Sequence, residues 1–377
     1  NHGTPYGGMS TLVTGKTGKA ISFDGANDYI DIADANILDF GVNDFTVYAW
    51  IKPSSFGAGN REINLLSKCS GYSGSAGWVI EADTYSGGSS TTYNWNFANT
   101  GQSSWGNTNV QTGLYSVGQW RLIVSKRETN VNYAYTDAIL NSTNAHANTG
   151  ISVNNIHNVM LGGKEGWQSI YYPGLIDEVR MASKARNGNW IKTEYNNQNS
   201  TTSFYTVNGE ESNFTTANYP YKVKLTINAA QVNGSVTEFP VYVDLNGMPA
   251  HFFANVTSSG ADIRMTTSDL VTQVPLELVS LSKATTNGEL WFKASSLSSV
   301  SNTDYYLWYG FNGASMLSAS SAYGSQAVWS NGFVAVYHMN ALTNGTASVL
   351  DSTSYANHGT PRGGMSTLAT GKTGRAI

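Results

Sequence analysis

Oxygen-bearing side chains gather in three short segments, and theirs is the first chemistry that the sequence suggests. Asp24, Asn27 and Asp28 lie in FDGANDY, Asp177 lies in IDEV, and Asp351 opens DSTS. Ca²⁺ takes roughly six to eight oxygens, mostly carboxylates, amide side chains and backbone carbonyls on loops. We therefore predict a structural Ca²⁺ site built from these residues. The alternative is that they only form turns, because Asp and Asn side chains hydrogen-bond their own backbone.

The residue patterns of familiar enzyme classes are missing. Glycoside hydrolysis uses two carboxylates that flank the scissile bond. Asp177 and Glu178 are adjacent instead, and on a regular strand they would face opposite sides. The six His residues lack metal-ligand spacing, and no G-x-S-x-G, H-E-x-x-H or P-loop motif occurs. We expect no enzymatic activity.

Aromatic residues in the Gly-, Ser- and Asn-rich stretch at 78–115 are candidates for stacking on sugar rings. Ligand-binding residues concentrate on loops of this composition. The candidate sugar contacts are Trp78, Trp95 and Trp105, with Tyr85, Tyr93 and Tyr115 beside them. The alternative is that most of these rings fill the core, which aromatic side chains often dominate.

The first 21 residues recur at the far end of the chain, where residues 357–377 repeat residues 1–21 without a gap. The two copies differ only at Tyr6/Arg362, Val13/Ala369 and Lys19/Arg375. Such a match predicts one period of a tandem array, 356 residues long (357 − 1 = 356), plus the start of the next period. Units that meet head to tail form an open filament unless the rotation closes a ring.

Short apolar or alternating runs, separated by Gly, Asn and Ser clusters, predict an all-β fold of two β-sandwich (jelly-roll) domains. The expected divisions are a first sandwich at 1–205, a linker at 206–217, a second sandwich at 218–330 and the start of another first sandwich at 331–377. One short helix is expected at 185–196, with Trp190, Ile191 and Tyr195 on one face.

Several ordered segments of the first half resemble the laminin-G-like branch of the concanavalin A-like lectin/glucanase superfamily. They are the NHGTP turn, GKAISFDGANDYI at 18–30, FTVYAWI at 45–51, GLIDEVRM at 174–181 and the exit WIKTEYNNQNS at 190–200. This resemblance covers about 1–205 and again 331–377. The block at 218–330 resembles domain-of-unknown-function family 2341, through YPYKVKLTI, FPVYVDL, ADIRM and DYYLWYG.

The resemblance implies that a strand near the end of the chain belongs ahead of GKAISFDG in the fold. The sandwich at 1–205 would then lack its own first strand and take it from a neighbouring copy. This subunit-joining strand comprises Phe333, Val334, Ala335, Val336, Tyr337, His338 and Met339. Two arrangements remain open: strand exchange between subunits and continuity within one giant chain. The resemblance also implies that DSTS meets IDEV, so that Ca²⁺ would reinforce the joint.

Composition favours an extracellular protein. Charged residues make up 12% and the net charge is −4, which argues against nucleic-acid binding because that needs a basic surface. No apolar stretch approaches the roughly 18 residues of a membrane span. Cys69 is the single cysteine and is expected to be buried. Six N-x-S/T sequons permit glycosylation, at Asn141, Asn199, Asn213, Asn233, Asn255 and Asn344.

These observations predict a structural and adhesive repeat unit of an extracellular filament or giant surface protein. Its partners would be copies of itself, joined head to tail. The alternative function is a carbohydrate-binding, lectin-like module of a secreted or surface protein, with glycans as partners.

Overall fold

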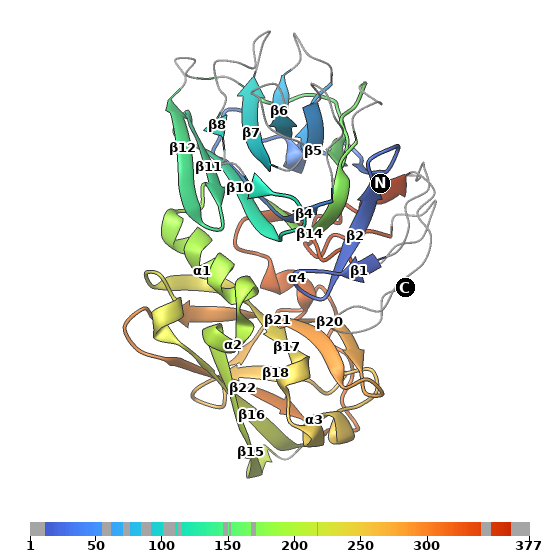
Figure 1. Cartoon of the computed structure of the whole chain (residues 1–377). Helices are drawn as coiled ribbons and strands as arrows, with labels where there is room; N and C mark the ends of the chain where they lie inside the picture. The colour runs from blue at the N-terminus through green and yellow to red at the C-terminus, as the bar shows by residue number, and fades with distance from the viewer. Residues whose placement is uncertain are drawn as a thin grey trace.

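The computed structural model describes residues 12–54, 62–70, 76–83, 92–100, 110–111, 115–145, 150, 152–166, 171–216, 218–340 and 348–362. Within these ranges the chain is mostly β, as predicted, and its sheets form two sandwich-like pairs. Figure 1 shows the first pair above the second, with helices α1 and α4 where the two meet. No helix in the described ranges has the length and apolar character that a membrane crossing requires.

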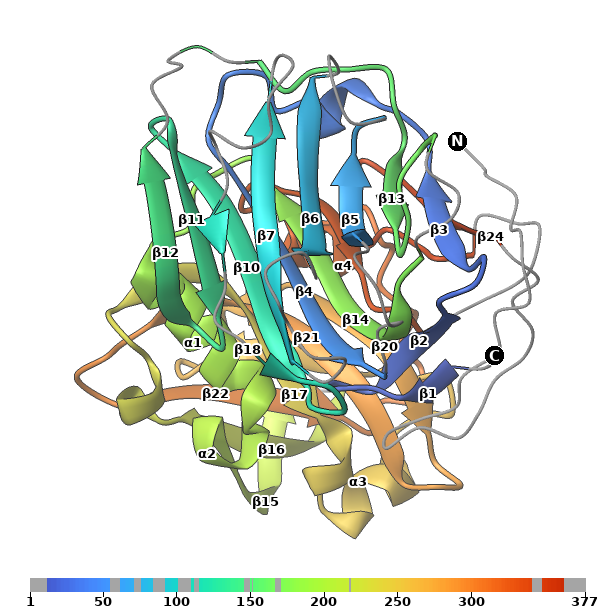
Figure 2. The same cartoon turned by 45° about the horizontal axis from the view of Figure 1, so that its top comes forward.

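Two eight-stranded sheets face each other in the first pair, which we call the first sandwich (Figure 2). One runs β1 (Leu12–Thr14), β2 (Lys19–Asp24), β14 (Pro173–Ala182), β4 (Phe45–Pro53), β10 (Arg121–Glu128), β11 (Val131–Thr136) and β12 (Ile139–Ala145), with β23 (Phe333–Tyr337) also on β14. The other runs β24 (Thr360–Arg362), β3 (Tyr29–Ile32), β13 (Val159–Leu161), β5 (Glu62–Lys68), β6 (Gly77–Asp83), β7 (Thr92–Thr100) and β8 (Val110–Gln111), with β9 (Tyr115–Ser116) on β7.

Strand alternation builds the core of the first sandwich. Val47 and Ala49 of β4 point into the same hydrophobic core as Ile30 and Leu161 of the opposite sheet. Trp50 points outward but is also buried, because a helix covers this face. That double burial explains why the predicted strand at 45–51 reads as an almost continuous apolar run.

The covering helix is α1 (Gly188–Asn199), and it confirms the predicted helix with a later start. Asn187 caps it by accepting a hydrogen bond from the Trp190 backbone N–H at 2.9 Å, which fixes its first turn. Tyr195 stacks on Trp50 with ring centroids 5.7 Å apart. Two of the three residues expected on one face, Trp190 and Ile191, are buried.

The second pair of sheets, which we call the second sandwich, follows α1. Its five-stranded sheet runs β15 (Tyr205–Thr216), β16 (Tyr219–Ile227), β22 (Thr303–Tyr309), β18 (Arg264–Thr267) and β19 (Gln273–Val274). Its three-stranded sheet runs β17 (Val236–Asp244), β21 (Asn287–Leu297) and β20 (Leu276–Ser282). Short helical turns complete it: α2 (Thr201–Phe204), η3 (Ala229–Gln231), η4 (Leu245–Gly247), α3 (Ala250–Asn255) and α4 (Ser325–Val328), with η1 (Asn36–Leu38) in the first sandwich.

The predicted linker at 206–217 is wrong, because residues 205–216 form strand β15. The strand pairs with β16 from Tyr205 opposite Ile227 to Thr216 opposite Tyr219. It lies at the edge of its sheet, so its backbone needs a partner on one side only. An edge strand therefore tolerates polar side chains, and the sequence shows little apolar alternation there.

The predicted strand near the end of the chain exists as β23, but it completes the first sandwich of its own chain. Residues 331–377 were expected to open another domain. Instead, Val179 pairs with Tyr337 and Ala182 with Phe333, while β24 pairs with β3 in the opposite sheet. We call the described residues of 333–362 the clasp, because they place one strand in each sheet. An unpaired edge beside β14 would leave backbone N–H and C=O groups without partners, and β23 satisfies them.

Strands β2 and β23 share one edge of β14. Ile176 pairs with Ile21 of β2, and the pairing with β23 begins at Val179. Between them the register shifts, and Glu178 takes a positive φ of 47°. A positive φ is uncommon for a residue with a side chain. It marks a bulge, and at this bulge the strand paired with this edge of β14 changes from β2 to β23.

Candidate functional site

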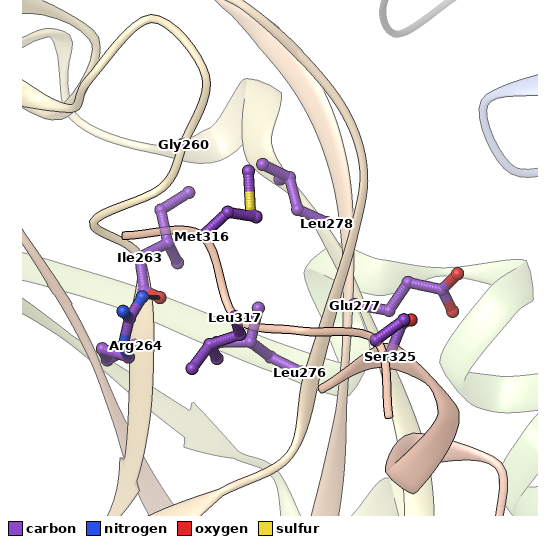
Figure 3. A pocket seen from close by; sticks show the side chains of 10 residues that line it. Gly260, Ile263, Arg264, Leu276, Glu277, Leu278, Met316, Leu317 and Ser325 are labelled. Atoms are coloured by element: carbon purple, nitrogen blue, oxygen red, sulfur yellow. Dashed lines mark hydrogen bonds between the residues drawn. The ribbon is translucent and has the colours of Figure 1, made fainter. Parts of the chain in front are cut away.

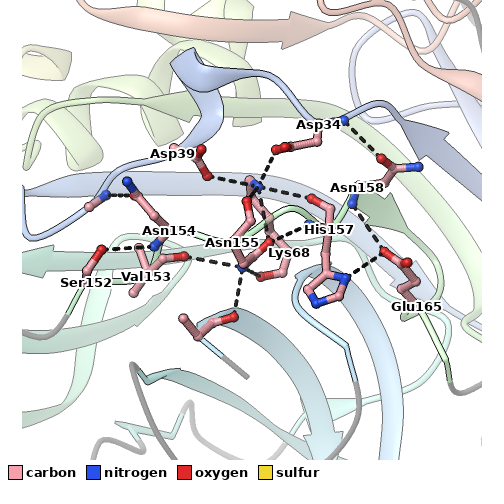
Figure 4. A network of polar contacts seen from close by, with 12 residues as sticks. Asp34, Asp39, Lys68, Ser152, Val153, Asn154, Asn155, His157, Asn158 and Glu165 are labelled. Carbon is pink, nitrogen blue, oxygen red and sulfur yellow. Dashed lines mark hydrogen bonds and ion pairs between the residues drawn. The ribbon is translucent and has the colours of Figure 1, made fainter. Parts of the chain in front are cut away.

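A buried lysine organises the loops beside β13 (Figure 4). Lys68 ends β5, and its side chain is only 1% exposed. Its Nζ lies 2.7 Å from Asp34 Oδ1 and 3.0 Å from Asp39 Oδ1. It also donates to the backbone carbonyls of Asn155 and His157, at 3.2 and 3.0 Å. A buried ammonium is tolerated when it is paired and hydrogen-bonded in this way.

Asn155 fixes the loop above that lysine. Its Nδ2 donates to the carbonyls of Lys68 and Ala76, at 2.9 and 2.8 Å. Its Oδ1 accepts from the His157 backbone N–H at 2.8 Å. The loop at 152–158 is therefore held by both the side chain and the backbone of β5, which limits its freedom before any ligand arrives.

The outer side of this loop carries polar groups, and we call Asn154, Ile156, His157, Asn158 and Glu165 the rim. Glu165 Oε2 lies 3.2 Å from His157 Nδ1 and accepts from the Asn158 backbone N–H at 3.3 Å. The Glu165 side chain is 46% exposed, and Ile156 is 86% exposed. The carboxylate of Glu165 and the imidazole of His157 can hydrogen-bond the hydroxyl groups of a ligand. The exposed side chain of Ile156 can pack against its C–H groups.

A second cluster of charges lies buried where the two sandwiches and the clasp meet. Arg180 of β14 donates to Glu178 at 2.6 Å and also pairs with Glu194 of α1. Its guanidinium carbon lies 4.4 Å from the ring centroid of Trp291 and 5.0 Å from that of Trp329. Both rings belong to the 205–332 part of the chain, so one cation joins the two sandwiches.

His338 of the clasp continues this cluster. Its two ring nitrogens lie 3.0 Å from Glu178 and 3.2 Å from Glu277. Burial alone would lower the pKa of His338, but these two carboxylates raise it well above its usual value. Burial alone would raise the pKa of Glu178, yet the charges of His338 and Arg180 bring it down to about 2. The cluster is therefore a set of paired ions at neutral pH.

Two further carboxyls in this joint have raised pKa values. Burial, and next the charge of Glu178, raises the pKa of Asp177 well above its usual value. The same two causes raise the pKa of Glu289 to about 8. Asp177 Oδ2 accepts from the backbone of Lys16 and Thr17, at 2.7 and 2.9 Å. The expectation that Asp177 and Glu178 face opposite sides assumed a regular strand, and the bulge removes that regularity.

The predicted calcium ligands lie in separate places. Asp24 Oδ1 accepts from the backbone of Ala26 and Asn27, at 2.7 and 3.3 Å. Asp28 Oδ2 accepts from the Asp24 backbone at 2.8 Å, and burial raises the pKa of Asp28 to about 7. These bonds are those of an Asx-type turn, which is the alternative that the sequence left open.

Asp351 is likewise engaged by its own turn. Its Oδ1 accepts from the backbone of Val336 and Thr353, both at 2.9 Å. Its Oδ2 accepts from the Asn357 backbone at 2.9 Å and from the Thr353 hydroxyl at 2.8 Å. Nowhere in the described ranges do three carboxylate, His or Cys side chains gather as metal ligands would. The structural Ca²⁺ site therefore stays an untested prediction.

The prediction that Trp78 contacts sugar is wrong. Its side chain is completely buried, because it points into the core between the two sheets of the first sandwich. Trp95 lies in β7 opposite Ala82, but its side chain is outside the described part of the chain, as is Trp105 entirely. The rim was not predicted from the sequence, in which the polar run NNIHN at 154–158 is its only signal.

Two other predictions concern reactive or modified side chains. Cys69 is buried as expected, and burial raises the pKa of its thiol to about 12, so it is not a reactive nucleophile. Three sequon asparagines are exposed, at Asn141, Asn199 and Asn233, whereas Asn255 is half-buried beside His251. The side chain of Asn213 and all of Asn344 lie outside the described residues.

A small pocket of about 180 Å³ opens in the second sandwich (Figure 3). Its walls are mainly apolar and come from Ile263, Leu276, Leu278, Met316 and Leu317. The charged groups beside it already have protein partners. Arg264 donates to the carbonyls of Ala261, Ile263 and Ser315, and Glu277 accepts from Trp329 and Ser352. This pocket therefore offers little polar recognition.

Residues 24–192 match the family model of the concanavalin A-like lectin/glucanases superfamily. This match confirms the resemblance for most of the first sandwich, while the resemblance assigned to 218–330 remains a prediction. No curated protein matches the sequence.

Solved structures similar to this one share little sequence with it. The binding domain of Paraclostridial Mosquitocidal Protein 1 has a TM-score of 0.40 at 13% identity, covering 82% of this chain and 86% of that one. Domain 4 of AbnA, an extracellular arabinanase from Geobacillus stearothermophilus, was solved with arabinotriose; it has a TM-score of 0.37 at 16% identity and covers 51% and 85%. A heptameric SAP-like pentraxin from Limulus polyphemus has a TM-score of 0.37 at 14% identity and covers 48% and 84%. These likenesses carry no statement about function.

Proposed function

We propose that the first sandwich is a glycan-binding module of the lectin type, which acts outside the cell and binds sugars without cleaving them. The observation that carries the proposal is the match of residues 24–192 to the concanavalin A-like lectin/glucanases superfamily. Laminin-G-like domains usually belong to secreted or surface proteins, which supports the extracellular assignment. The low charge of the chain, 12% of its residues, agrees with it.

The rim is the surface that we assign to the glycan. Sugars present hydroxyl groups and apolar C–H faces together, and the rim pairs Glu165 and His157 with the exposed side chain of Ile156. The buried Lys68 network below it holds the loop in place. A site that is rigid before binding loses less conformational entropy when the ligand docks.

Glycan-array screening of the whole chain tests this function, followed by calorimetry with the sugars that bind. Glu165→Ala and His157→Ala are each expected to weaken binding by about tenfold to a hundredfold, since a hydrogen bond to a charged group contributes about 1.5–3 kcal/mol. Glu128→Ala is the matched control, because Glu128 is similarly exposed, at 40%, in the same sandwich. The mass of the bound glycan should be unchanged after incubation.

Two results would count against the glycan proposal. One is an array without any sugar that binds. The other is binding that Glu165→Ala and His157→Ala weaken no more than Glu128→Ala does. Shortened glycan after incubation would instead contradict only the absence of cleavage.

We also propose a second function, head-to-tail assembly into an extracellular filament with adhesive character. One specific observation favours it: the first sandwich is completed by strands from the other end of the sequence, β23 and β24. The near-identical sequences at 1–21 and 357–377 support the same function, since they allow one unit to run into the next.

Negative-stain microscopy of the concentrated chain tests assembly. The expected result is fibres with an axial repeat that spans both sandwiches, together with light scattering that rises as the chain is concentrated. Particles that keep the size of a single chain of 40.5 kDa at every concentration would contradict this second function.

A further inference from the structure

The contacts divide the chain into two bodies that meet along the joint. Body A is the first sandwich with α1, residues 12–199. Body B is the second sandwich with the clasp, residues 205–362. Strand β23 pairs with β14, strand β24 pairs with β3, and Trp190 of body A packs on Phe239 of body B with ring centroids 5.0 Å apart. The surface between the bodies is therefore extensive and buried.

The clasp cannot separate from the second sandwich without losing buried apolar contacts and hydrogen bonds. Phe333 and Val336 of β23 lie in the second core, while Val334 and Tyr337 lie in the first. Glu277 of the second sandwich also binds the clasp, through His338 and Ser352. Removing the clasp alone would expose these groups, so the clasp and the second sandwich move as one block.

The link between body A and body B is short. It consists of Ser200, Thr201, Thr202 and Ser203, because Phe204 is already buried in the second core. Thr202 and Ser203 are exposed. Three of these residues belong to the single-turn helix α2, in which the backbone N–H groups of Ser203 and Phe204 donate to the Ser200 carbonyl, at 3.1 and 3.0 Å. The Ser200 and Ser203 hydroxyls also lie 2.9 Å apart. One isolated helical turn is marginally stable, so these local bonds are easily lost. A few exposed residues at the end of a helix are suited to absorb the dihedral changes of a hinge.

The repeated sequence contributes to body A from both of its copies. The second copy supplies β24, at Thr360–Arg362, and the first copy supplies β1 and the start of β2. Arg362 aligns with Tyr6 (362 − 356 = 6), and β1 begins at Leu12, so five residues separate the two strands in the repeat (12 − 6 − 1 = 5). In a single copy of the repeat, the segment that matches β24 therefore precedes the segments that match β1 and the start of β2.

We propose that body B of one copy of this chain occupies body A of a second copy, with Ser200–Ser203 as the hinge. The exchanged block is then residues 205–362, not the clasp strand alone. This inference rests on the assembly proposed above and specifies how the copies join. Every contact across the joint is kept on exchange, so the hinge and the chain concentration set the balance between closed and exchanged forms.

A disulfide across the joint reveals which chain donates β23. Met181 of β14 and Ala335 of β23 lie directly opposite each other. Residues paired in this way on antiparallel strands have Cα atoms within the roughly 4.4–6.8 Å that a disulfide needs. In a Cys69→Ala background, Met181→Cys/Ala335→Cys is oxidised and run on a non-reducing denaturing gel. Val47→Cys/Met181→Cys is the matched control, because both residues lie within body A.

The exchange predicts that cross-linked chains form a ladder whose share rises with concentration. Deleting Thr202 and Ser203 shortens the hinge and should move most of the protein into the ladder. The control pair should stay in the single-chain band throughout. Single-chain bands only, at every concentration and with the native hinge, would overturn the exchange. Fibres in the microscope without a ladder would retain assembly and reject this mode of joining.

Discussion

A chain that ends after Gly332 is expected to lose cooperative folding of the first sandwich. The clasp buries Val334, Tyr337, Met339 and Val349 almost completely in the core of the first sandwich. Burying each large apolar side chain contributes about 1.5–3 kcal/mol, and the sum rivals the total stability of a domain, about 5–15 kcal/mol. The edge of β14 at Val179–Ala182 would also lose its backbone partners.

Size-exclusion chromatography and thermal unfolding by circular dichroism measure this loss. The truncated chain should aggregate and bind a hydrophobic dye, because its apolar slot is open. A chain that ends after Arg362 keeps both clasp strands and serves as the control. Adding a separate peptide of residues 333–362 should restore part of the transition. A monomeric truncated chain with a sharp unfolding transition would refute the role given to the clasp.

Arg180→Ala is expected to lower the free energy of unfolding by about 3–5 kcal/mol, the usual effect of removing one partner from a buried ion cluster. The substitution takes Arg180 away from Glu194 and leaves Glu178 with His338 as its ion-pair partner, and both Glu side chains are at most 2% exposed. It also removes the cation that lies against Trp291 and Trp329.

Urea unfolding of the variant measures this change. Arg121→Ala is the matched control, since Arg121 pairs with Asp137 at 2.6 Å but keeps 29% of its side chain exposed. Exposed pairs contribute about 0–1 kcal/mol, so the control should change little. Equal effects of the two substitutions would show that the Arg180 cluster does not join the two sandwiches.

The strands with strong apolar patterns were predictable from the sequence, since alternation or continuous burial follows from strand geometry alone. The run at 45–51 became β4, and the helix near Trp190 became α1. Strand β15 was missed because an edge strand needs little apolar alternation. The place of the clasp was not predicted, because the sequence indicates which strand fits beside β14 but not which chain provides that strand.

The candidate site was less predictable, for reasons that lie in tertiary packing. A lysine at the end of a strand, such as Lys68, usually reaches into solvent, and only the loops around it make it a buried support. Trp78 follows a stretch rich in Gly and Ser, as a binding residue often does, yet its side chain lies in the core between the two sheets. The Arg180 cluster draws on positions far apart in the sequence, such as Glu178 and His338, which no local pattern connects.

Because β14 pairs with β23, the sandwich that is synthesised first is the one that is completed last. Ala182 pairs with Phe333, 151 positions later (333 − 182 = 151). A ribosome that adds about 5–20 residues per second needs about 8–30 s to cover that interval. During this time the half synthesised first stays incomplete, whereas the second sandwich uses neighbouring sequence and can form at once. The first sandwich can therefore be completed only after the later half of the chain has been made. Until then, the open edge of β14 has to be kept from pairing with other chains.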